Sequence, residues 1–276
     1  MKGKEMQDGS DPTYTMGYSD EFLALLKRRN AENVAFHLLP RLKPGLRVLD
    51  LGCGPGTISV GLAKAVEPGE LHGVDMEESQ VEMAQAAAVA GGHDNASFRT
   101  GDATDLPYED DFFDVVHFHA VLMHVPDTRT TLAEAKRVLK PGGFVSAREL
   151  IGDSSFLKPT LGSLEDVWET FQSLLTANGG HPQIGKELKG ILIDAGFSDL
   201  EISGSFETFA TGEDIAFFHA LATGWFFASD TVEVAVKHGL ATHAQFDDWQ
   251  RTLDEWKDAS GALAALAWGE AIGFKP

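Results

Sequence analysis

The chain has 276 residues and 43% of them are hydrophobic, which is enough for one α/β domain with an elaborated cap or for two small domains. Its formal net charge of -20 repels phosphate backbones and anionic lipid, so we expect neither nucleic acid nor a membrane as a partner. The single cysteine, Cys53, excludes an intrachain disulfide and disfavours a thiolate metal site, so we expect no metal. Residues 1–11 are polar and do not resemble a secretory signal, so we expect a cytoplasmic protein.

The first half of the chain alternates between strand and helix patterns. Ser19 is expected to cap a helix whose apolar side chains recur in steps of three and four. Beyond it, short apolar runs predict strands, and glycine or proline stops separate them from helices. The predicted strands are 47–51, 71–74, 97–100, 113–118 and 144–147, and the helices between them are 57–66, 79–90 and 128–139. This alternation predicts a parallel sheet with right-handed crossovers.

Beyond Glu149 the pattern is mostly helical. Helices are predicted after Ser163 and over 186–195, two short strands forming a hairpin over 200–209, and helices from Glu213 to the end. Ligands of open α/β sheets bind beyond the carboxyl ends of the strands, so an insert after the fifth strand is placed to cover a ligand. The expected regions are an N-terminal segment that closes over the cofactor (1–39), a core (40–150), a helical lid (151–185), the end of the core sheet (186–210) and a C-terminal helical extension (211–276).

The segment from Asp50 to Gly56 runs from a strand through a glycine turn into a helix. A dinucleotide-binding turn would place its third glycine at position 57, which is Thr57. Pro55 has no N–H to offer a phosphate, and Asp50 disfavours a pyrophosphate but tolerates a sulfonium and an ammonium. The segment therefore favours a phosphate-free, partly cationic adenosine ligand, although the glycines alone would also suit a plain tight turn. We expect Asp50, Gly52, Cys53 and Gly54 around this ligand, with Cys53 as a small buried filler.

Polar residues follow two further strands at the same edge. Asp75 ends the second strand, where a carboxylate can accept hydrogen bonds from both ribose hydroxyls, and Met76 beside it can pack on an adenine face. Asp102 follows the third strand and can accept from the adenine amino group, while the backbone N–H of Ala103 can donate to a ring nitrogen. Either aspartate could instead serve only as a cap or turn residue.

Together these motifs resemble a known family. The stretches VLDLGCGPG (48–56), GVDM (73–76), GDATDLPYEDDFFDVV (101–116) and RVLKPGG (137–143) resemble class I methyltransferases that depend on S-adenosylmethionine (SAM), in particular the type 11 group with the ubiquinone and menaquinone C-methyltransferases. The resemblance covers roughly residues 40–150. It implies a doubly wound, mostly parallel seven-stranded sheet, SAM as methyl donor with S-adenosylhomocysteine as product, and closure of Tyr18 over the methionine end.

A general base helps methyl transfer when the nucleophile must lose a proton, and histidine suits that role near neutral pH. His119 and His124 flank the end of the fourth strand, near the expected methyl position. His119 is expected to pack beside the cofactor, whereas His124 and Glu149 are the candidate bases. His181 and His219 are expected to be surface or packing residues. Aromatic residues of the added helices are expected to build the core and to line an apolar pocket, namely Trp168, Trp225, Phe226 and Phe227.

The sequence thus predicts an enzyme that moves a methyl group from SAM to O, C or N of a small apolar or aromatic metabolite. Two alternatives stay open at this point: a SAM-binding protein without methyl transfer, and a nucleotide-dependent oxidoreductase. The partner expected is a small-molecule substrate, and a homodimer is left open.

Overall fold

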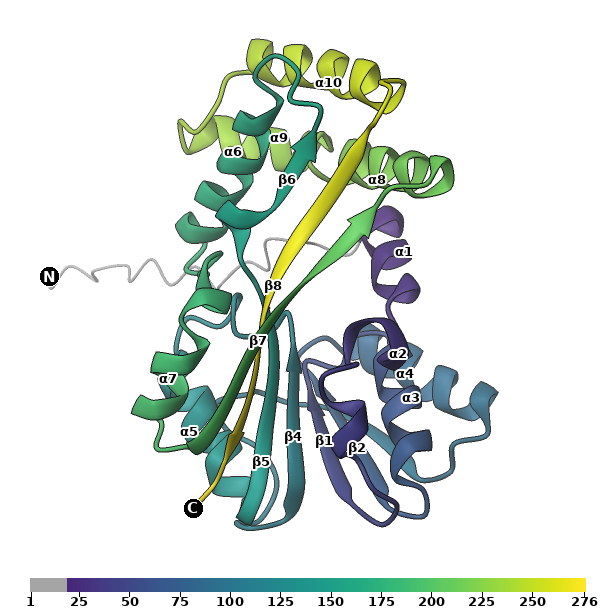
Figure 1. Ribbon diagram of the computed structural model, residues 1–276, viewed down its shortest axis with the longest axis vertical. Helices are drawn as coiled ribbons and strands as arrows, with labels where there is room; N and C mark the ends of the chain where they lie inside the picture. The colour runs from purple at the N-terminus through teal and green to yellow at the C-terminus, as the bar shows by residue number, and fades with distance from the viewer. Residues whose placement is uncertain (1–18) are drawn as a thin grey trace, which may run out of the picture.

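A computed structural model describes residues 19–276, and Tyr18 lies outside the described residues (Figure 1). The core is one mixed sheet with the strand order β3-β2-β1-β4-β5-β8-β6, in which β7 pairs with the free edge of β8. Strands β1 to β5 are parallel, whereas β6, β7 and β8 pair antiparallel. The strands are β1 Arg47–Leu51, β2 Glu70–Asp75, β3 Ala96–Thr100, β4 Phe113–His119, β5 Leu139–Leu150, β6 Phe156–Lys158, β7 Ser198–Phe209 and β8 Leu263–Phe274. The expected α/β fold is confirmed, with eight strands among the described residues in place of the seven expected.

Helices cover both faces of this sheet and one of its ends. The α-helices are α1 Asp20–Arg28, α2 Ala31–Val34, α3 Thr57–Val66, α4 Glu78–Gly91, α5 Thr128–Val138, α6 Leu164–Ala177, α7 Leu188–Asp194, α8 Gly212–Trp225, α9 Ser229–Lys237 and α10 His243–Lys257. Ser19 caps α1 as expected, because its hydroxyl accepts from the backbone N–H of Phe22 at 3.2 Å. No helix within residues 19–276 is long and apolar enough to cross a membrane.

Alternate residues of the strands serve two separate cores. Val48 of β1 packs with Leu62 of α3 and other residues of α2 to α4, whereas Leu49 beside it packs with residues of α5 and α7. This split follows from the two-residue period of a strand, which sends neighbouring side chains to opposite faces. Because each face is covered by helices, the central strands are buried on both sides, which explains why all residues of β4 except Asp114 are buried.

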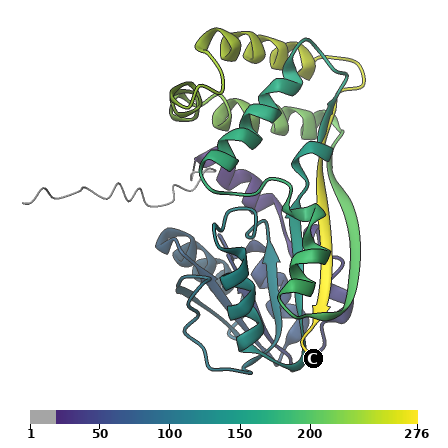
Figure 2. The same ribbon diagram turned by 90° about the vertical axis from the view of Figure 1, so that its left-hand side faces the viewer.

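A third apolar cluster forms a cap. It joins α1, α6 and α8 to α10, with Trp225, Trp249 and Trp256 among its buried residues. Figures 1 and 2 show these helices gathered at one end of the sheet, beyond the carboxyl ends of the parallel strands. The cap therefore lies over the edge where ligands of such sheets bind.

The C-terminal residues correct two predictions. Leu263–Phe274, expected to be helical, form β8 between β5 and β7, and 200–209 belong to one long strand, β7, instead of a hairpin. A mostly apolar run does not distinguish a buried strand from a buried helix, and its alanines have a high helix propensity. The segment is a strand because it pairs with β5 and β7, and only glycine fits at Gly269, where a Cβ would lie 2.0 Å from the carbonyl oxygen of Gly185.

Candidate active site

One cavity lies between the sheet and the cap, with a volume of about 780 Å³. This volume falls within the range of roughly 300–1,000 Å³ that is usual for small-molecule sites. The loops after β1, β2, β3 and β4 form one part of its wall, and residues of α1, α6, α8 and β8 form the other. One ligand, or two ligands side by side, can therefore contact both the glycine loop and the cap within this cavity.

The glycine loop after β1 has the backbone that the motif predicts. Gly52, Gly54 and Gly56 all have positive φ, at 75°, 51° and 78°. A Cβ on Gly52 would lie 2.4 Å from a methyl group of Val121, and one on Gly56 would lie 2.6 Å from the Cα of Ala84. Only glycine fits at these positions, for conformational and steric reasons together. Gly52, Cys53 and Gly54 all line the cavity.

Asp75 joins the end of β2 to this loop. Its Oδ2 accepts from the backbone N–H of Gly54 at 2.9 Å, and its Oδ1 accepts from that of Glu77 at 3.0 Å. Burial raises the pKa of Asp75 above its ordinary value, while these two backbone hydrogen bonds act in the opposite direction. Met76 beside it lines the cavity and leaves 68% of its surface exposed, as a platform for a flat ring would.

Gln80 of α4 was not singled out from the sequence. It lines the same cavity and is buried, yet neither atom of its side-chain amide has a hydrogen-bond partner among the described residues. An unsatisfied buried polar group costs about 1–3 kcal/mol, so such a group beside a cavity indicates a partner supplied by a ligand or by water. The only sequence signal for this residue is that Gln80 is polar while the other residues on the buried face of α4, Ala84 and Ala88, are apolar.

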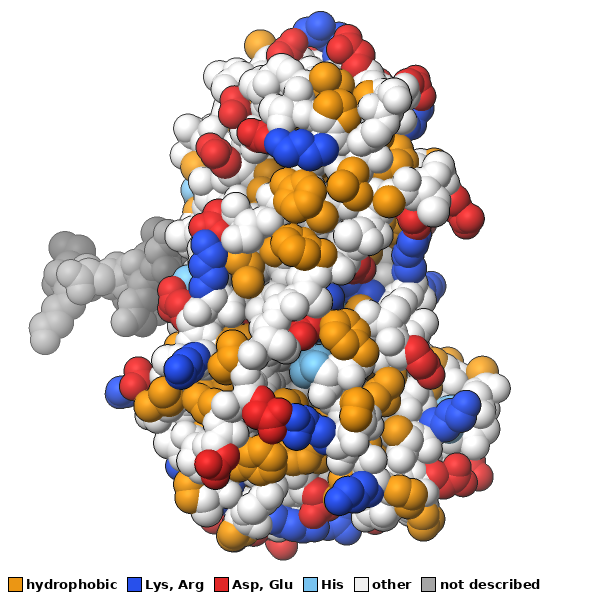
Figure 3. All heavy atoms as spheres, viewed as in Figure 1, with side chains coloured by type: hydrophobic (Ala, Val, Ile, Leu, Met, Phe, Trp, Pro, Cys, Tyr) orange, Lys and Arg blue, Asp and Glu red, His pale blue; other side chains and the backbone are white. Residues whose placement is uncertain are grey.

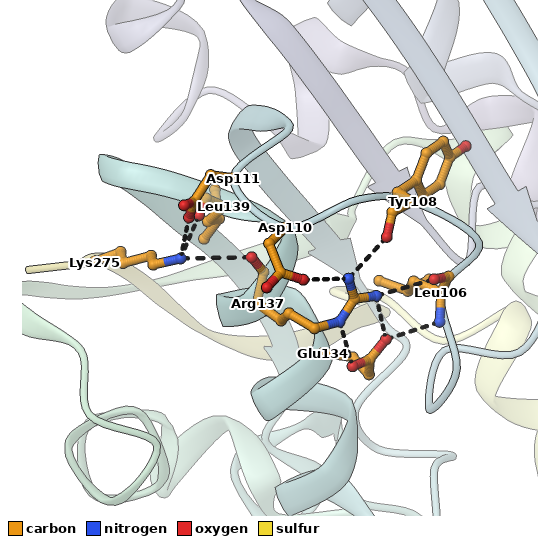
Figure 4. Close-up of polar contacts among 8 residues, drawn as sticks. All are labelled: Leu106, Tyr108, Asp110, Asp111, Glu134, Arg137, Leu139 and Lys275. Carbon is orange, nitrogen blue, oxygen red and sulfur yellow. Dashed lines mark hydrogen bonds and ion pairs between the residues drawn. The ribbon is translucent and has the colours of Figure 1, made fainter.

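The loop after β3 brings Asp102 and Ala103 to the cavity wall. Asp102 accepts from the backbone N–H and the hydroxyl of Thr104, both at 2.8 Å. Further along the same loop, Arg137 of α5 donates to the carbonyl oxygens of Leu106 and Tyr108 and pairs with Glu134 (Figure 4). This network ties the loop to α5, which gives the arginine of the RVLKPGG motif a structural role.

Asp50 lies beneath the glycine loop and is not among the residues that line the cavity. Its carboxylate accepts a hydrogen bond from the Ser59 hydroxyl at 2.5 Å. Burial raises the pKa of Asp50 to about 6, although the Ser59 hydrogen bond lowers it. The structure thus places Asp50 as a support of the turn between β1 and α3, and a direct contact with the ligand stays a prediction.

Glu149 at the end of β5 is fully buried and also does not line the cavity. Its two oxygens accept from three consecutive backbone N–H groups, those of Val121, Leu122 and Met123, at 3.0–3.2 Å. Burial raises the pKa of Glu149 to about 7 against these hydrogen bonds. Since both oxygens are engaged with the loop after β4, the geometry favours support of that loop over the role of a base that we expected for Glu149.

The loop that Glu149 holds carries the two histidines of interest. Ala120 has a positive φ of 55°, an uncommon conformation for a residue other than glycine that is often found at functional sites. His119 and His124, on either side of this bend, both line the cavity. Burial lowers the pKa of His124 to about 4, and burial together with the charge of Arg29 lowers that of His119 well below its ordinary value. Both imidazoles are therefore neutral at pH 7.

The cap supplies the apolar part of the wall. Trp168, Phe171, Trp225 and Phe226 line the cavity, whereas Phe227 does not. Trp168 stacks on Phe171 with 5.2 Å between ring centroids, and its indole N–H donates to the carbonyl oxygen of Gly152. His181 and His219 lie outside the cavity, paired with Glu187 and Asp254 at the surface.

On the face of the molecule seen in Figure 3, acidic and basic side chains are interspersed.

Comparison with known proteins identifies the family. Residues 42–196, more than half of the chain, match the family described as the methyltransferase domain. An uncharacterized methyltransferase of Schizosaccharomyces pombe is 33% identical over 267 residues, which cover 92% of this chain and 88% of the relative. A demethylmenaquinone methyltransferase of Bacillus pumilus is 31% identical over 176 residues, or 59% of this chain and 75% of the relative. The crystal structure of the YcgJ protein from Bacillus subtilis has the same fold, with a TM-score of 0.61 at 19% identity over 88% of this chain and 98% of that one. The chain belongs to the methyltransferase domain family and is a SAM-dependent methyltransferase.

Proposed function

We propose that this enzyme transfers the methyl group of SAM to O, C or N of a small apolar or aromatic metabolite. The observation that carries the proposal is the shared cavity: the glycine loop and Asp75 form one part of its wall, and Trp168, Phe171 and Trp225 form another. An apolar acceptor can thus lie against the cap while the cofactor lies against the carboxyl ends of the strands. The similarity to a demethylmenaquinone methyltransferase supports a ring-bearing acceptor.

The residues at the strand ends fit the adenosine part of SAM. We assign the ribose hydroxyls to Asp75, whose oxygens keep lone pairs beyond the two backbone bonds they accept. We assign one adenine face to Met76 and the adenine edge to Asp102 and Ala103. Gln80 is a further candidate for the ribose, because its amide offers both the donor and the acceptor that a hydroxyl needs.

Bound SAM supplies an activated methyl group, because the leaving group of its transfer is a neutral thioether. The protein contributes mainly orientation and the exclusion of water, and good orientation is worth roughly 7–11 kcal/mol. We assign the role of base to His124, since it lines the cavity and its lowered pKa leaves it unprotonated at pH 7. Glu149 acts through the loop it holds and is a positioning residue.

Two measurements test this function. Isothermal titration calorimetry should show binding of SAM and no binding of NAD, whereas binding of NAD alone would contradict the assignment of the cavity. Release of S-adenosylhomocysteine, measured with a panel of phenols, quinols and aromatic amines, should then reveal an acceptor. Tight SAM binding with no turnover on any member of the panel would contradict the proposed class of acceptor.

A further inference from the structure

The described residues contain eight buried side-chain nitrogen and oxygen atoms without a hydrogen-bond partner. Two belong to Gln80, and the other six come from five residues that lie on or beside one face of the sheet. Those five are His37, His117, His119, Arg148 and Trp268. Unsatisfied buried groups are rare in folded proteins, so this concentration in one place indicates a missing polar partner.

The register of the strands explains how these residues meet. On this face, β4 presents Val115, then His117 and His119 as it approaches its carboxyl end. His119 lies opposite Arg148 of β5, and Arg148 lies opposite Glu270 of β8. The apolar rows of the sheet thus become polar just where the strands reach the cavity.

Two residues of this group, His119 and Trp268, line the cavity, and Arg29 lines it beside them. The His119 ring stacks on Trp268 with 5.2 Å between centroids and 27° between planes. The guanidinium of Arg29 lies 5.0 Å from the Trp268 ring centroid and pairs with Glu207 at 2.9 Å. Phe22 and Leu25 of α1 also line the cavity.

Two residues of this wall, Trp268 and His119, have buried hydrogen-bonding atoms without a partner among the described residues. The indole N–H of Trp268 is an unpartnered donor, and the neutral imidazole of His119 has one donor and one acceptor nitrogen, both unpartnered. A 180° flip of the His119 ring about χ2 exchanges its nitrogen and carbon positions and keeps the stack on Trp268. Donors outnumber acceptors, and the guanidinium groups of Arg29 and Arg148 lie close to the same indole ring, where they pair with Glu207 and Glu270. A ligand oxygen that accepts hydrogen bonds satisfies this wall best.

We propose that Trp268, His119 and Arg29 form an oxygen-binding subsite for the acceptor, which makes the preferred substrate a ring-bearing molecule with a phenol- or enol-type oxygen. This inference rests on the proposed methyl transfer to a small apolar acceptor and narrows its class. His119 would then determine acceptor specificity, in addition to packing beside the cofactor as we expected from the sequence.

Equilibrium dialysis of the full chain saturated with S-adenosylhomocysteine tests the subsite, with 2-naphthol and naphthalene as matched probes. Binding of 2-naphthol should be about 10-fold tighter than that of naphthalene, since a site that bonds an oxygen discriminates against the analogue that lacks it. His119→Phe keeps the aromatic stack and should reduce this preference to about 3-fold or less. His119→Asn restores a donor and an acceptor and should recover part of the preference. His219→Phe, a histidine of the cap outside the cavity, is the matched control and should keep it in full.

The outcomes separate this inference from the proposed function. Equal binding of the two probes, no binding of 2-naphthol, or an unchanged preference in His119→Phe would overturn the subsite. Calorimetry with SAM on the same preparations is the separate readout for the cofactor site. If the wild type binds SAM but does not prefer 2-naphthol over naphthalene, only the subsite is rejected. If the wild type does not bind SAM, the proposed function is rejected.

Discussion

Asp75 accepts a hydrogen bond from the backbone N–H of Gly54 at 2.9 Å, and this bond joins the carboxyl end of β2 to the glycine loop after β1. The carboxylate that we assign to the ribose therefore also holds the loop assigned to the rest of the cofactor. Removal of its charge should affect both functions at once.

Asp75→Asn keeps an oxygen that can accept from Gly54 but removes the negative charge. We expect SAM affinity to fall about 10- to 100-fold, because hydrogen bonds to charged groups contribute roughly 1.5–3 kcal/mol. Calorimetry with SAM measures the change. Glu78→Gln, an exposed carboxylate at the start of α4 outside the cavity, is the control and should bind SAM like the wild type. Unchanged affinity in Asp75→Asn would remove Asp75 from the ribose role.

Gln80→Met removes two unsatisfied polar atoms at nearly constant volume. The free energy of unfolding of the ligand-free protein should stay the same or increase, since no hydrogen bond is lost. SAM affinity should nevertheless fall about 3- to 10-fold, because the ribose would lose the hydrogen bond that we assign to this amide. Urea unfolding and calorimetry measure the two effects. A lower stability with full SAM affinity would show that Gln80 is a structural residue only.

Arg137→Met should loosen the loop that carries Asp102 and Ala103, because the guanidinium binds the carbonyl oxygens of Leu106 and Tyr108. We expect a lower thermal midpoint and SAM affinity reduced a few-fold, measured by thermal unfolding and calorimetry. Arg251→Met removes a comparable i,i+3 pair on α10 and should leave SAM affinity intact. Equal behaviour of the two variants would show that the loop does not depend on Arg137.

Glu149 should make stability depend on pH. Burial raises its pKa from 4.5 to about 7, so between these values the folded protein binds more protons than the unfolded chain. The free energy of unfolding contributed by this group must therefore fall as pH rises from about 4.5 to 7, by about 3 kcal/mol. Asp50 acts in the same direction in wild type and variant alike. Urea unfolding across this range should show the wild type losing about 3 kcal/mol of stability relative to Glu149→Gln as pH rises, and a constant difference between the two proteins would contradict the raised pKa.

His124→Phe should lower kcat about 10²- to 10⁴-fold on an acceptor that must lose a proton, with SAM affinity unchanged. Because burial holds the pKa of His124 near 4, protonation of this group should not reduce kcat/KM of the wild type between pH 5 and 8. His181→Phe, a surface histidine paired with Glu187, is the control. A full rate in His124→Phe would exclude the histidine as base.

The sequence was sufficient to predict the parallel core and the residues at its edge. The sequence predicts that Gly52, Asp75 and Asp102 lie close together. Each lies at the carboxyl end of a parallel strand, and those strands end at the same edge of the sheet. His119 and His124 were found in the same way at the end of β4.

The rest depended on contacts between distant segments. Glu149 was predicted at the correct strand end, but the direction of its side chain depends on strand register and on the loop that it holds. The apolar run that forms β8 has no periodicity, so only its place between β5 and β7 makes it a strand. The group around Trp268 combines residues from β4, β5, β8 and the segments after α1 and α2, and no local pattern joins them.

The central claim is that the glycine loop and Asp75 bind the adenosyl ligand while the cap covers the acceptor. A crystal structure of the protein with S-adenosylhomocysteine tests it most directly. We predict the ribose on Asp75, an adenine face on Met76, and the vacant methyl position directed toward His119, His124 and the aromatic wall of the cap. Adenosyl density elsewhere, or a sulfur atom turned away from that wall, would contradict the account.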